Sequence, residues 1–396
     1  MNLHDPIVIA GAARTPIGGF QGEMKDVIAP QLGAVAIRAS LERAAVPFDA
    51  VDEVLFGCVL TAGLGQAPAR QAALAAGLPV SAPATTVNKM CGSGMKAAML
   101  AHDAIAVGSA KIAVGGGMES MSNAPYLLDR ARAGYRMGHG RAIDHMFLDG
   151  LEDAYDKGRL MGTFAEDCAQ CYSFSRAAQD EYAAASLTRA QKAIADGSFA
   201  AEIARVTAPS GKGQREVTQD EQPLKASLEK IPLLKPAFRE AGTVTAANSS
   251  SIADGAAALV LMRRSEAERR GIQPLAAIAG HATYANASHL FPTAPIGAIR
   301  ALVERTGWAL DEVDLFEINE AFAAVAMAAM HDLALPHDKL NVHGGACALG
   351  HPIGASGARI LVTLLAALKK YDLKRGVAAL CIGGGEATAM AVERIE

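Results

Sequence analysis

The chain of 396 residues is 51% hydrophobic and 20% charged, and its 37 basic and 41 acidic residues leave a formal net charge of −4. At about 100–200 residues per domain this length predicts two or three domains, and the apolar content excludes an intrinsically disordered chain. The charge balance argues against a nucleic-acid-binding protein, and the longest apolar stretches, such as residues 321–330, are about half as long as a membrane span.

Two features of the sequence bear on the cellular compartment. The first residues lead straight into an apolar strand, so we expect no signal or transit peptide. The cysteines are scattered through a long chain, which predicts reduced thiols in the cytoplasm rather than a disulfide framework. They are Cys58, Cys91, Cys168, Cys171, Cys347 and Cys381.

Apolar runs alternate with helical patterns along the first part of the chain. Strands are predicted at residues 7–10, 54–56 and 112–114, and helices at 31–45 and 94–107. Strands that alternate with helices of about 10–15 residues indicate an α/β fold with a largely parallel core, and leave antiparallel pairing of some strands open.

The second part of the chain repeats the first. Residues 48–56 have a counterpart in residues 310–316. In each half a turn then opens a helix that leads to a strand and three glycines, with Cys91 in the first turn and His351 in the second. This order predicts an internal duplication, with two similar α/β halves whose turns face each other. The glycine triplets stand at 115–117 and 383–385.

The segment between the repeats has a different character. It contains a helical pattern at residues 179–195 and a polar stretch at 210–222, which suggest an inserted subdomain. We therefore divide the chain into three parts. These are residues 1–117 as the first half, completed by about 246–270, residues 118–245 as the inserted loop domain, and residues 271–396 as the second half.

Cys91 is the first candidate for chemistry. It precedes Gly92-Ser93-Gly94 and a predicted helix, where backbone N–H groups and the helix dipole would lower the pKa of the thiol and favour a nucleophilic thiolate. The alternative is a small buried cysteine, which is the commonest fate of this residue type. His351 occupies the matching turn, and a histidine opposite a thiol is a natural base or hydrogen-bond donor, so the pairing favours a functional role for both.

Two further residues follow predicted strands. Cys381 precedes Gly383, where glycines can present backbone N–H groups as an oxyanion hole. Asn319 ends another strand and begins a helix, so it is either an N-cap or an amide that orients a water or a carbonyl group.

Other patterns point to no cofactor. Cys168 and Cys171 have CxxC spacing but no partner pair, so two thiols one turn apart in a helix are favoured over zinc. Neither glycine triplet belongs to a phosphate loop or a dinucleotide-binding motif. His289 and His343 have no spacing that selects a metal, so no metal ligands are predicted on these grounds.

Taken together, these motifs resemble the thiolase family. The resemblance covers essentially the whole chain and implies a five-layered αβαβα thiolase fold with duplicated halves and a loop domain that binds coenzyme A. The matching segments are Asn88 to Gly94, Gly115 to Met121, Asn319 to Phe322, Gly344 to Gly357 and Cys381 to Gly385.

The resemblance also implies a role for each candidate residue. Cys91 would accept the acyl group, and His351 would activate it and help to hold the thioester oxygen. Cys381 would be the acid/base that takes the α-proton of the second acyl-CoA. Asn319 would position a water in the oxyanion hole of His351, and the N–H groups of Cys91 and Gly383 would form the other hole.

For substrate binding the family pattern points to Ser250 on coenzyme A and to apolar residues along the pantetheine path. Several of these could equally be ordinary core residues. Phe291 would form the wall of the acyl pocket, and Tyr182 matches a potassium-associated tyrosine of branched-chain members, although it could simply be an interfacial aromatic. The path residues are Met161, Phe238, Ala246, Ala321 and Phe322.

Four positions depart from the commonest family pattern and bear on acyl specificity. They are Leu160, Phe291 with Pro292, His343, and Glu386. The first hypothesis is reversible condensation of two acetyl-CoA to acetoacetyl-CoA and CoA through an acetyl-cysteine, with CoA thioesters as substrates and no cofactor.

Three other functions compete with that hypothesis. They are a broader-chain degradative thiolase, a related ketoacyl synthase, which Cys381 argues against, and a catalytically silent lipid-binding member of the fold. The family further implies a homotetramer, a dimer of dimers, with contacts in residues 130–146, and neither nucleic-acid nor membrane partners.

Overall fold

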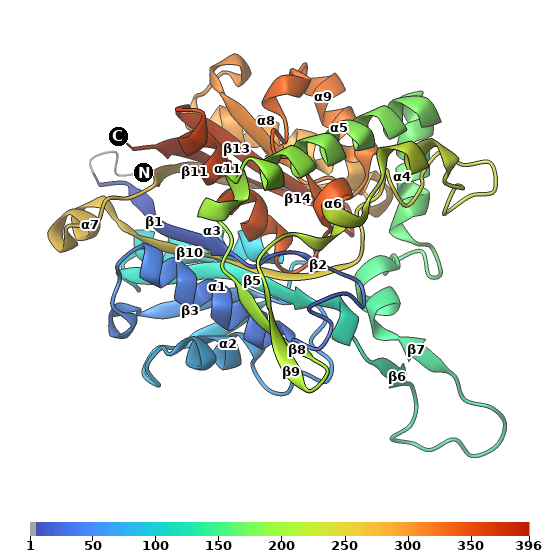
Figure 1. Ribbon diagram of the computed structural model, residues 1–396, viewed down its shortest axis with the longest axis horizontal. Coiled ribbons are helices and arrows are strands. Elements are labelled where there is room, and N and C mark those ends of the chain that lie inside the picture. The colour runs from blue at the N-terminus through green and yellow to red at the C-terminus, as the bar shows by residue number, and fades with distance from the viewer. Residues whose placement is uncertain (1–4, 396) are drawn as a thin grey trace.

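The computed structural model describes residues 5–395 (Figure 1), and its centre is one mixed sheet of ten strands. The neighbouring strands follow the order β12-β13-β14-β11-β1-β10-β5-β3-β4, and the short β2 (Gly18–Gly19) pairs with β10. The first half contributes β1 (Ile7–Arg14), α1 (Ala29–Arg43), β3 (Glu53–Gly57), α2 (Pro68–Ala76), β4 (Ala84–Val87), α3 (Ser93–Ala106), β5 (Ile112–Ser120), β10 (Ala253–Arg263) and α7 (Arg264–Arg270).

The second half repeats this order of elements, except at the place of β4. It contributes β11 (Ala276–Ala285), α8 (Ala294–Thr306), β12 (Leu315–Ile318), α9 (Ala323–Leu333), α10 (Ala346–Leu349), α11 (Ser356–Lys370), β13 (Arg375–Ile382) and β14 (Glu386–Arg394). The short helix α10 stands between α9 and α11 where the first half has β4.

The strand pairing confirms the duplication. β1 is antiparallel to β10, β10 is antiparallel to β5, and β5 is parallel to β3. In the second half β11, β14, β13 and β12 pair in the same senses. The halves join through β1 and β11, which pair at only two positions, Val8 with Ala277 and Ile9 with Ala276.

The two copies are also anchored in the same way. In the first, Asp52 accepts hydrogen bonds from the backbone N–H groups of Lys111 and Ile112, at 2.8 and 2.9 Å. In the second, Asp314 does the same for Lys374 and Arg375, at 2.9 and 2.7 Å. Each aspartate therefore fixes the start of the strand that follows the central helix of its half.

Alternation along the strands builds the layers. On β1, Val8 packs into the core with α1 and α2, whereas Ile9 packs into a second core with α3 and α11. A third core lies under α8 and α9, on the far face of the second half. From bottom to top in Figure 1 the order is helices, strands, the central pair α3 and α11, strands, and helices, which confirms the predicted αβαβα arrangement.

One part of the duplication argument is wrong, because the glycine triplets are not counterparts. Gly115–Gly117 lie inside β5, where a Cβ on Gly117 would stand only 2.0 Å from the carbonyl oxygen of Gly354. Gly383–Gly385 instead form the turn between β13 and β14, and Gly384 and Gly385 have φ of +94° and +90°. The first triplet permits close packing and the second permits a tight turn.

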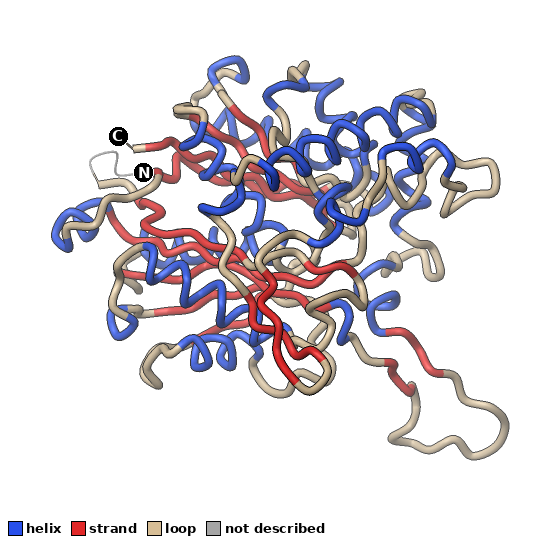
Figure 2. Tube along the Cα trace, viewed as in Figure 1, coloured by secondary structure: helices blue, strands red, loops and turns tan. Residues whose placement is uncertain are grey.

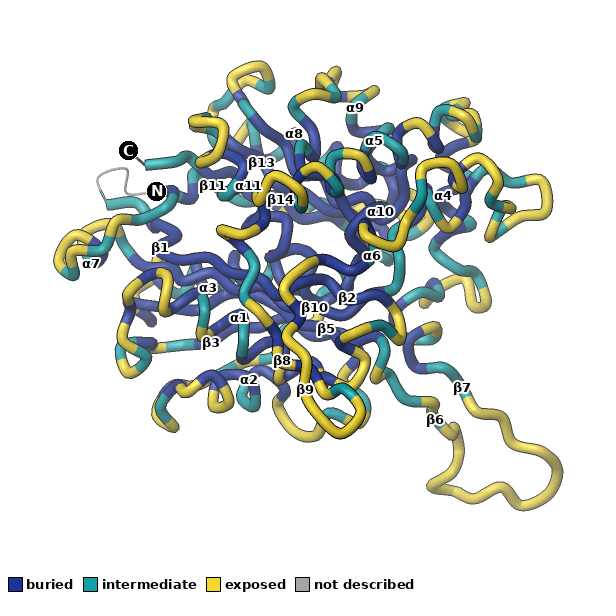
Figure 3. Tube along the Cα trace, in the orientation of Figure 1, coloured by how far each residue is buried: buried dark blue, intermediate teal, exposed yellow. Residues whose placement is uncertain are grey.

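The inserted segment packs against both halves, because residues of its α4 and α5 belong to the outer core of the second half and residues of its β8 and β9 to that of the first. β5 runs on to Ser120, so the first residues assigned to the insert complete a strand of the first half. The β6–β7 pair extends away from the body as an arm in Figure 2, and Figure 3 shows the loop at its tip exposed. The insert contains β6 (Tyr126–Leu128), β7 (Ala142–Asp144), α4 (Met161–Cys171), α5 (Arg176–Ala195), β8 (Val206–Ser210), β9 (Gly213–Val217) and α6 (Glu221–Lys225).

Two expectations from the sequence concern the cysteines and membrane-spanning helices. All six cysteines are free thiols, and Cys168 and Cys171 both lie near the end of helix α4. Within residues 5–395, no helix combines the length and apolar character needed to cross a membrane.

Candidate active site

The starts of helices α3 and α11 meet at the centre of the molecule, and glycines allow this contact. A Cβ on Gly94 would lie 3.0 Å from the carbonyl oxygen of Gly354, and one on Gly357 would lie 2.5 Å from the backbone nitrogen of Met95. Any larger residue would push the helices apart. The turns before them, which carry Cys91 and His351, therefore face each other as the repeat predicted.

Both turns open into one cavity of about 540 Å³. The cavity brings together Cys91, His351, Cys381 and Gly383. Three larger cavities, of about 730, 790 and 780 Å³, lie elsewhere and are lined by none of the six cysteines, so chemistry rather than size identifies the site. Five of the predicted substrate-binding residues also line it, namely Met161, Ser250, Phe291, Ala321 and Phe322.

The surroundings of Cys91 correct one expectation. The backbone N–H groups of Gly383 and of Cys91 itself hydrogen-bond to the sulfur, and they favour the thiolate. Burial outweighs them and raises the pKa of Cys91 to about 11, so the predicted lowering by the helix start is wrong. Without substrate the residue is a neutral thiol that needs a base.

His351 has the properties of that base. Its Nδ1 lies 2.6 Å from the hydroxyl oxygen of Ser356, and this hydroxyl donates to the carbonyl oxygen of Pro352 at 3.0 Å. Nδ1 therefore carries the proton that Ser356 accepts, which leaves Nε2 unprotonated. Nε2 is buried without a protein partner, and burial lowers the pKa of His351 to about 3, so the imidazole is neutral at physiological pH.

Cys381 and Asn319 complete the group. Burial raises the pKa of Cys381 well above its usual value, and the nearby Cys91 raises it further, because two neighbouring thiols resist becoming two anions. Asn319 is buried, and its side-chain nitrogen lies 3.5 Å from Nδ1 of His351. The side chain thus faces the Nδ1 side of the imidazole, and its role in an oxyanion hole stays a prediction.

Two of the predicted pantetheine contacts lie outside the cavity wall. Phe238 packs edge-to-face against Phe322, with ring centroids 6.0 Å apart, and supports it from behind. Ala246 is exposed at the surface. Phe291, in contrast, is buried and forms part of the cavity wall. Its ring centroid lies 6.1 Å from that of Phe164 and 6.5 Å from that of Phe322.

Tyr182 lies beneath the active-site turn rather than in the cavity. It is buried, its hydroxyl donates to Glu320 at 3.0 Å, and the amide of Asn341 approaches the same hydroxyl at 3.3 Å. These contacts fix the residue that follows Asn319. A potassium ion near Tyr182 stays a prediction.

Sequence reasoning missed a buried carboxylate that joins the halves. Glu119 accepts hydrogen bonds from the N–H groups of Val59, Leu60 and Gly354 at 3.0, 3.1 and 2.9 Å. It thereby ties the first half to the His351 turn, and burial raises its pKa to about 7. The Gly-Met-Glu-Ser motif was a signal, but its function was not predicted.

A surface ion pair connects the two turns around the thiols. Lys89, two residues before Cys91, contacts the carboxylate of Glu386, which follows the glycine turn. The unusual Glu386 is therefore explained by a partner on the opposite half.

Residues 7–265 match the family described as the thiolase N-terminal domain, and residues 272–394 match the thiolase C-terminal domain. The chain belongs to the thiolase family. The resemblance noted in the sequence is thereby confirmed.

Individual thiolases agree over the full length. An acetyl-CoA acetyltransferase of Cupriavidus necator is 49% identical over 98% of this chain and 99% of its own, and the cytosolic acetyl-CoA acetyltransferase of Mus musculus is 49% identical over 98% of each. The crystal structure of the Bacillus anthracis acetyl-CoA acetyltransferase superposes with a TM-score of 0.96 at 40% identity, covering 98% of this chain and 99% of that one. The thiolase fold is confirmed by this match.

Proposed function

We propose that this chain is an acetyl-CoA C-acetyltransferase that reversibly condenses two acetyl-CoA to acetoacetyl-CoA and CoA. The names of relatives at 47–50% identity support this activity. The structural observation that carries it is the meeting of two thiols, one neutral imidazole and two backbone N–H donors in one cavity.

The first half-reaction transfers an acetyl group to Cys91. Nε2 of His351 takes the thiol proton as the sulfur attacks the thioester carbon, and the bond to the CoA sulfur breaks. Cys381 gives its proton to the departing CoA thiolate and is left as a thiolate. Negative charge on the thioester oxygen develops close to the imidazolium, which then donates a hydrogen bond to it.

The second half-reaction forms the carbon–carbon bond. The Cys381 thiolate takes an α-proton from a second acetyl-CoA, and the resulting enolate attacks the acetyl carbon on Cys91. The oxygen of that acetyl group lies toward the N–H groups of Cys91 and Gly383, which already point at the sulfur. Collapse releases acetoacetyl-CoA, and the proton held by His351 returns to the Cys91 sulfur.

Two substitutions separate these steps. Cys91→Ala should gain no stable acetyl group from acetyl-CoA, as measured by intact-protein mass spectrometry. Cys381→Ala should still be acetylated at Cys91 but should fail to condense and to exchange the α-protons of acetyl-CoA with deuterium. A Cys91→Ala protein that gains the same acetyl mass would overturn the assignment, and a silent lipid-binding protein would show no acetylation in the unmodified chain.

Acyl specificity is the finer part of the proposal. The buried Phe291 lines the cavity, and we expect it to limit the acyl group to short chains while still admitting a 2-methyl branch. An extra methyl group in an apolar pocket changes kcat/KM by about 10–200-fold. We expect measurable cleavage of 2-methylacetoacetyl-CoA, with Phe291→Met reducing it more than cleavage of acetoacetyl-CoA.

The same cleavage assay distinguishes a short-chain thiolase from a broader-chain degradative thiolase, and it also tests for the potassium ion. Comparable rates on long 3-ketoacyl-CoA substrates would instead favour a broader-chain degradative enzyme, for which Leu160 is the first candidate. Rates compared in potassium and sodium salts test the predicted ion near Tyr182. If 2-methylacetoacetyl-CoA is cleaved in neither salt, the expectation that the enzyme accepts this branched substrate is contradicted.

Assembly and compartment complete the proposal. The segment at residues 130–146, of which 130–142 are exposed, is the expected tetramer contact, and light scattering of a chain with this exposed part shortened should show a dimer in place of a tetramer. Six free cysteines and the cytosolic mouse relative support a cytoplasmic location.

A further inference from the structure

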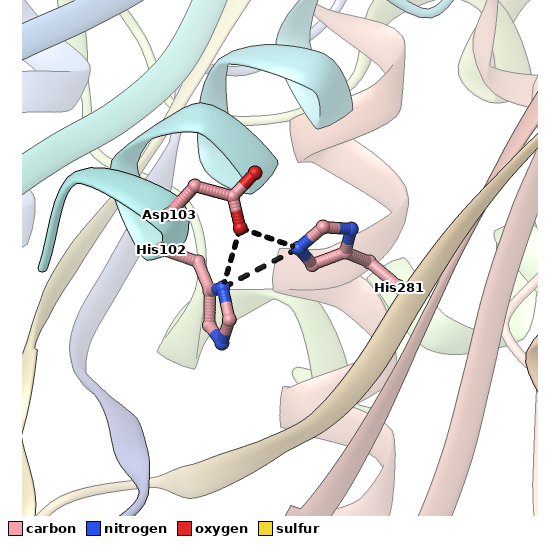
Figure 4. A group of neighbouring side chains, drawn as sticks. All are labelled: His102, Asp103 and His281. Atoms are coloured by element: carbon pink, nitrogen blue, oxygen red, sulfur yellow. Dashed lines mark hydrogen bonds and ion pairs between the residues drawn. The ribbon is translucent and has the colours of Figure 1, made fainter. Parts of the chain in front are cut away.

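A second cluster of ionisable side chains lies at the opposite end of α3 from Cys91. His102 and Asp103 stand near the end of α3, and His281 stands in the middle of β11. Figure 4 shows the three side chains pointing toward one another, so that two imidazoles and one carboxylate meet. The cluster therefore joins a helix of the first half to a strand of the second.

The spacing of the three facing atoms suits a small metal ion. Nδ1 of His102 lies 3.1 Å from Oδ1 of Asp103, and Nε2 of His281 lies 3.0 Å from the same oxygen and 3.3 Å from Nδ1 of His102. Bonds of about 2.0–2.1 Å to zinc place tetrahedral ligand atoms about 3.3 Å apart. An ion above this triangle of atoms would need little rearrangement.

Burial and charge fit the same ligand. The side chains of His102 and His281 are 8% and 17% exposed, whereas that of Asp103 is 48% exposed, so the nitrogens are screened from water and the carboxylate borders solvent. His102 also lines a cavity of about 730 Å³, which leaves room for further ligands.

We propose that His102, Asp103 and His281 bind one divalent transition-metal ion of the zinc class, with the remaining coordination position open to solvent. Two imidazoles and one carboxylate suit Zn²⁺, Co²⁺ or Ni²⁺ better than Mg²⁺ or Ca²⁺, which prefer oxygen ligands. Because the ligands come from α3 and β11, the bound ion would link the two halves and stabilise their packing. The sequence alone could not suggest this site, since 178 residues separate Asp103 from His281.

The chain supplies its own control. His331 and Asp332 repeat the His-Asp dipeptide in α9, with Nδ1 2.9 Å from Oδ1. There the second oxygen of Asp332 meets the hydroxyl of Tyr172 at 3.0 Å in place of an imidazole. If a His-Asp pair were enough to bind the metal, both pairs would bind it weakly. The proposed site needs a second imidazole, which His281 supplies to Asp103.

The experiment uses the full-length protein, stripped of metal with a chelator, and Zn²⁺ as the probe in titration calorimetry. The unchanged chain and His331→Gln should bind one equivalent that His281→Gln and Asp103→Asn lose. Zn²⁺ at about 100 times its dissociation constant should raise the midpoint of thermal unfolding by about 3 °C in the first two proteins only.

Co²⁺ absorption distinguishes the cluster from the thiols. Binding at the cluster gives visible bands without the near-ultraviolet band of thiolate ligation. The proposal is overturned if His281→Gln and Asp103→Asn bind as much Zn²⁺ as the unchanged chain, or if the thiolate band accompanies the only equivalent bound. Because the side chain of Asp103 is half-exposed, we expect Asp103→Asn to fold. This variant therefore tests the metal site even if His281→Gln fails to fold.

Discussion

The turn before α3 and the turn before α11 occupy equivalent places in the two halves, yet they carry different side chains. Cys91 receives two backbone N–H groups but stays a neutral thiol, whereas His351 is held by Ser356 in the one tautomer that can accept a proton from it. The scaffold is repeated, and the chemistry is divided between the copies. The duplicated fold thus brings the proposed nucleophile and the proposed base together, one from each copy.

The glycine triplets teach the complementary lesson. They read alike in the sequence, but Gly117 is a packing position against the His351 turn, and Gly383 is a hydrogen-bond donor at the Cys91 sulfur. The same residue type serves one half by having no side chain and the other by its backbone N–H. The following four predictions test these contrasts.

The largest effect is expected at His351. His351→Gln removes the base, so acetylation of Cys91 should slow by about 10²–10⁴-fold. Ser356→Ala keeps the imidazole but frees its tautomer, and a loss of about tenfold is expected, equal to one hydrogen bond. Single-turnover acetylation followed by mass spectrometry measures both. Equal losses would mean that His351 acts only through its hydrogen bond to Ser356.

The next effect contrasts the two triplets. Gly117→Ala places a methyl group against the carbonyl of Gly354 and should destabilise the protein by about 1–3 kcal/mol or more. Gly383→Ala meets only Met161, at 3.4 Å, and should change the free energy of unfolding by less than about 0.5 kcal/mol. Thermal unfolding of the two variants measures this difference. A Gly383→Ala protein as unstable as Gly117→Ala would mean that both triplets serve packing.

A smaller effect is expected where the turns are connected at the surface. Lys89 and Glu386 have side chains 21% and 34% exposed, so the pair should contribute less than about 1 kcal/mol. Glu386→Gln should lower kcat/KM by less than about threefold. Glu393→Gln, which breaks a comparable pair with Arg375, serves as the control. A loss in Glu386→Gln far above that of the control would show that this link positions the Cys91 turn.

The smallest expected effect is that of pH on acetylation. With the pKa of His351 lowered to about 3 and that of Cys91 raised to about 11, both groups are neutral over the whole range between. Raising the pH within this window deprotonates neither, so the acetylation rate should stay flat from about pH 6 to 9. With a free thiol of pKa about 8.5, the acetylation rate would instead rise about tenfold for each pH unit, as long as the pH is below that pKa. Such a rise between pH 6 and 8 would contradict the neutral pair.

The family, the duplication and the candidate active-site residues could all be predicted from local patterns in the sequence. Cys91, His351 and Cys381 stand in short glycine-rich turns next to predicted strands and helices, and such local signals survive without knowledge of the fold. The counterparts 48–56 and 310–316 were recognisable because both copies keep an aspartate that anchors the next strand. Turns and strand starts depend on residues close to them in the chain, so short sequence patterns can predict them.

Properties that depend on distant neighbours follow from the folded arrangement and not from local sequence. Burial among residues of both halves raises the pKa of Cys91 against the helix dipole, and β5 takes up the first glycine triplet because Gly354 approaches it from the other half. Ser356 fixes the tautomer of His351, and His281 reaches His102 across the junction of α3 and β11. Desolvation and contact are sums over residues brought together by folding, so no window of the sequence contains them.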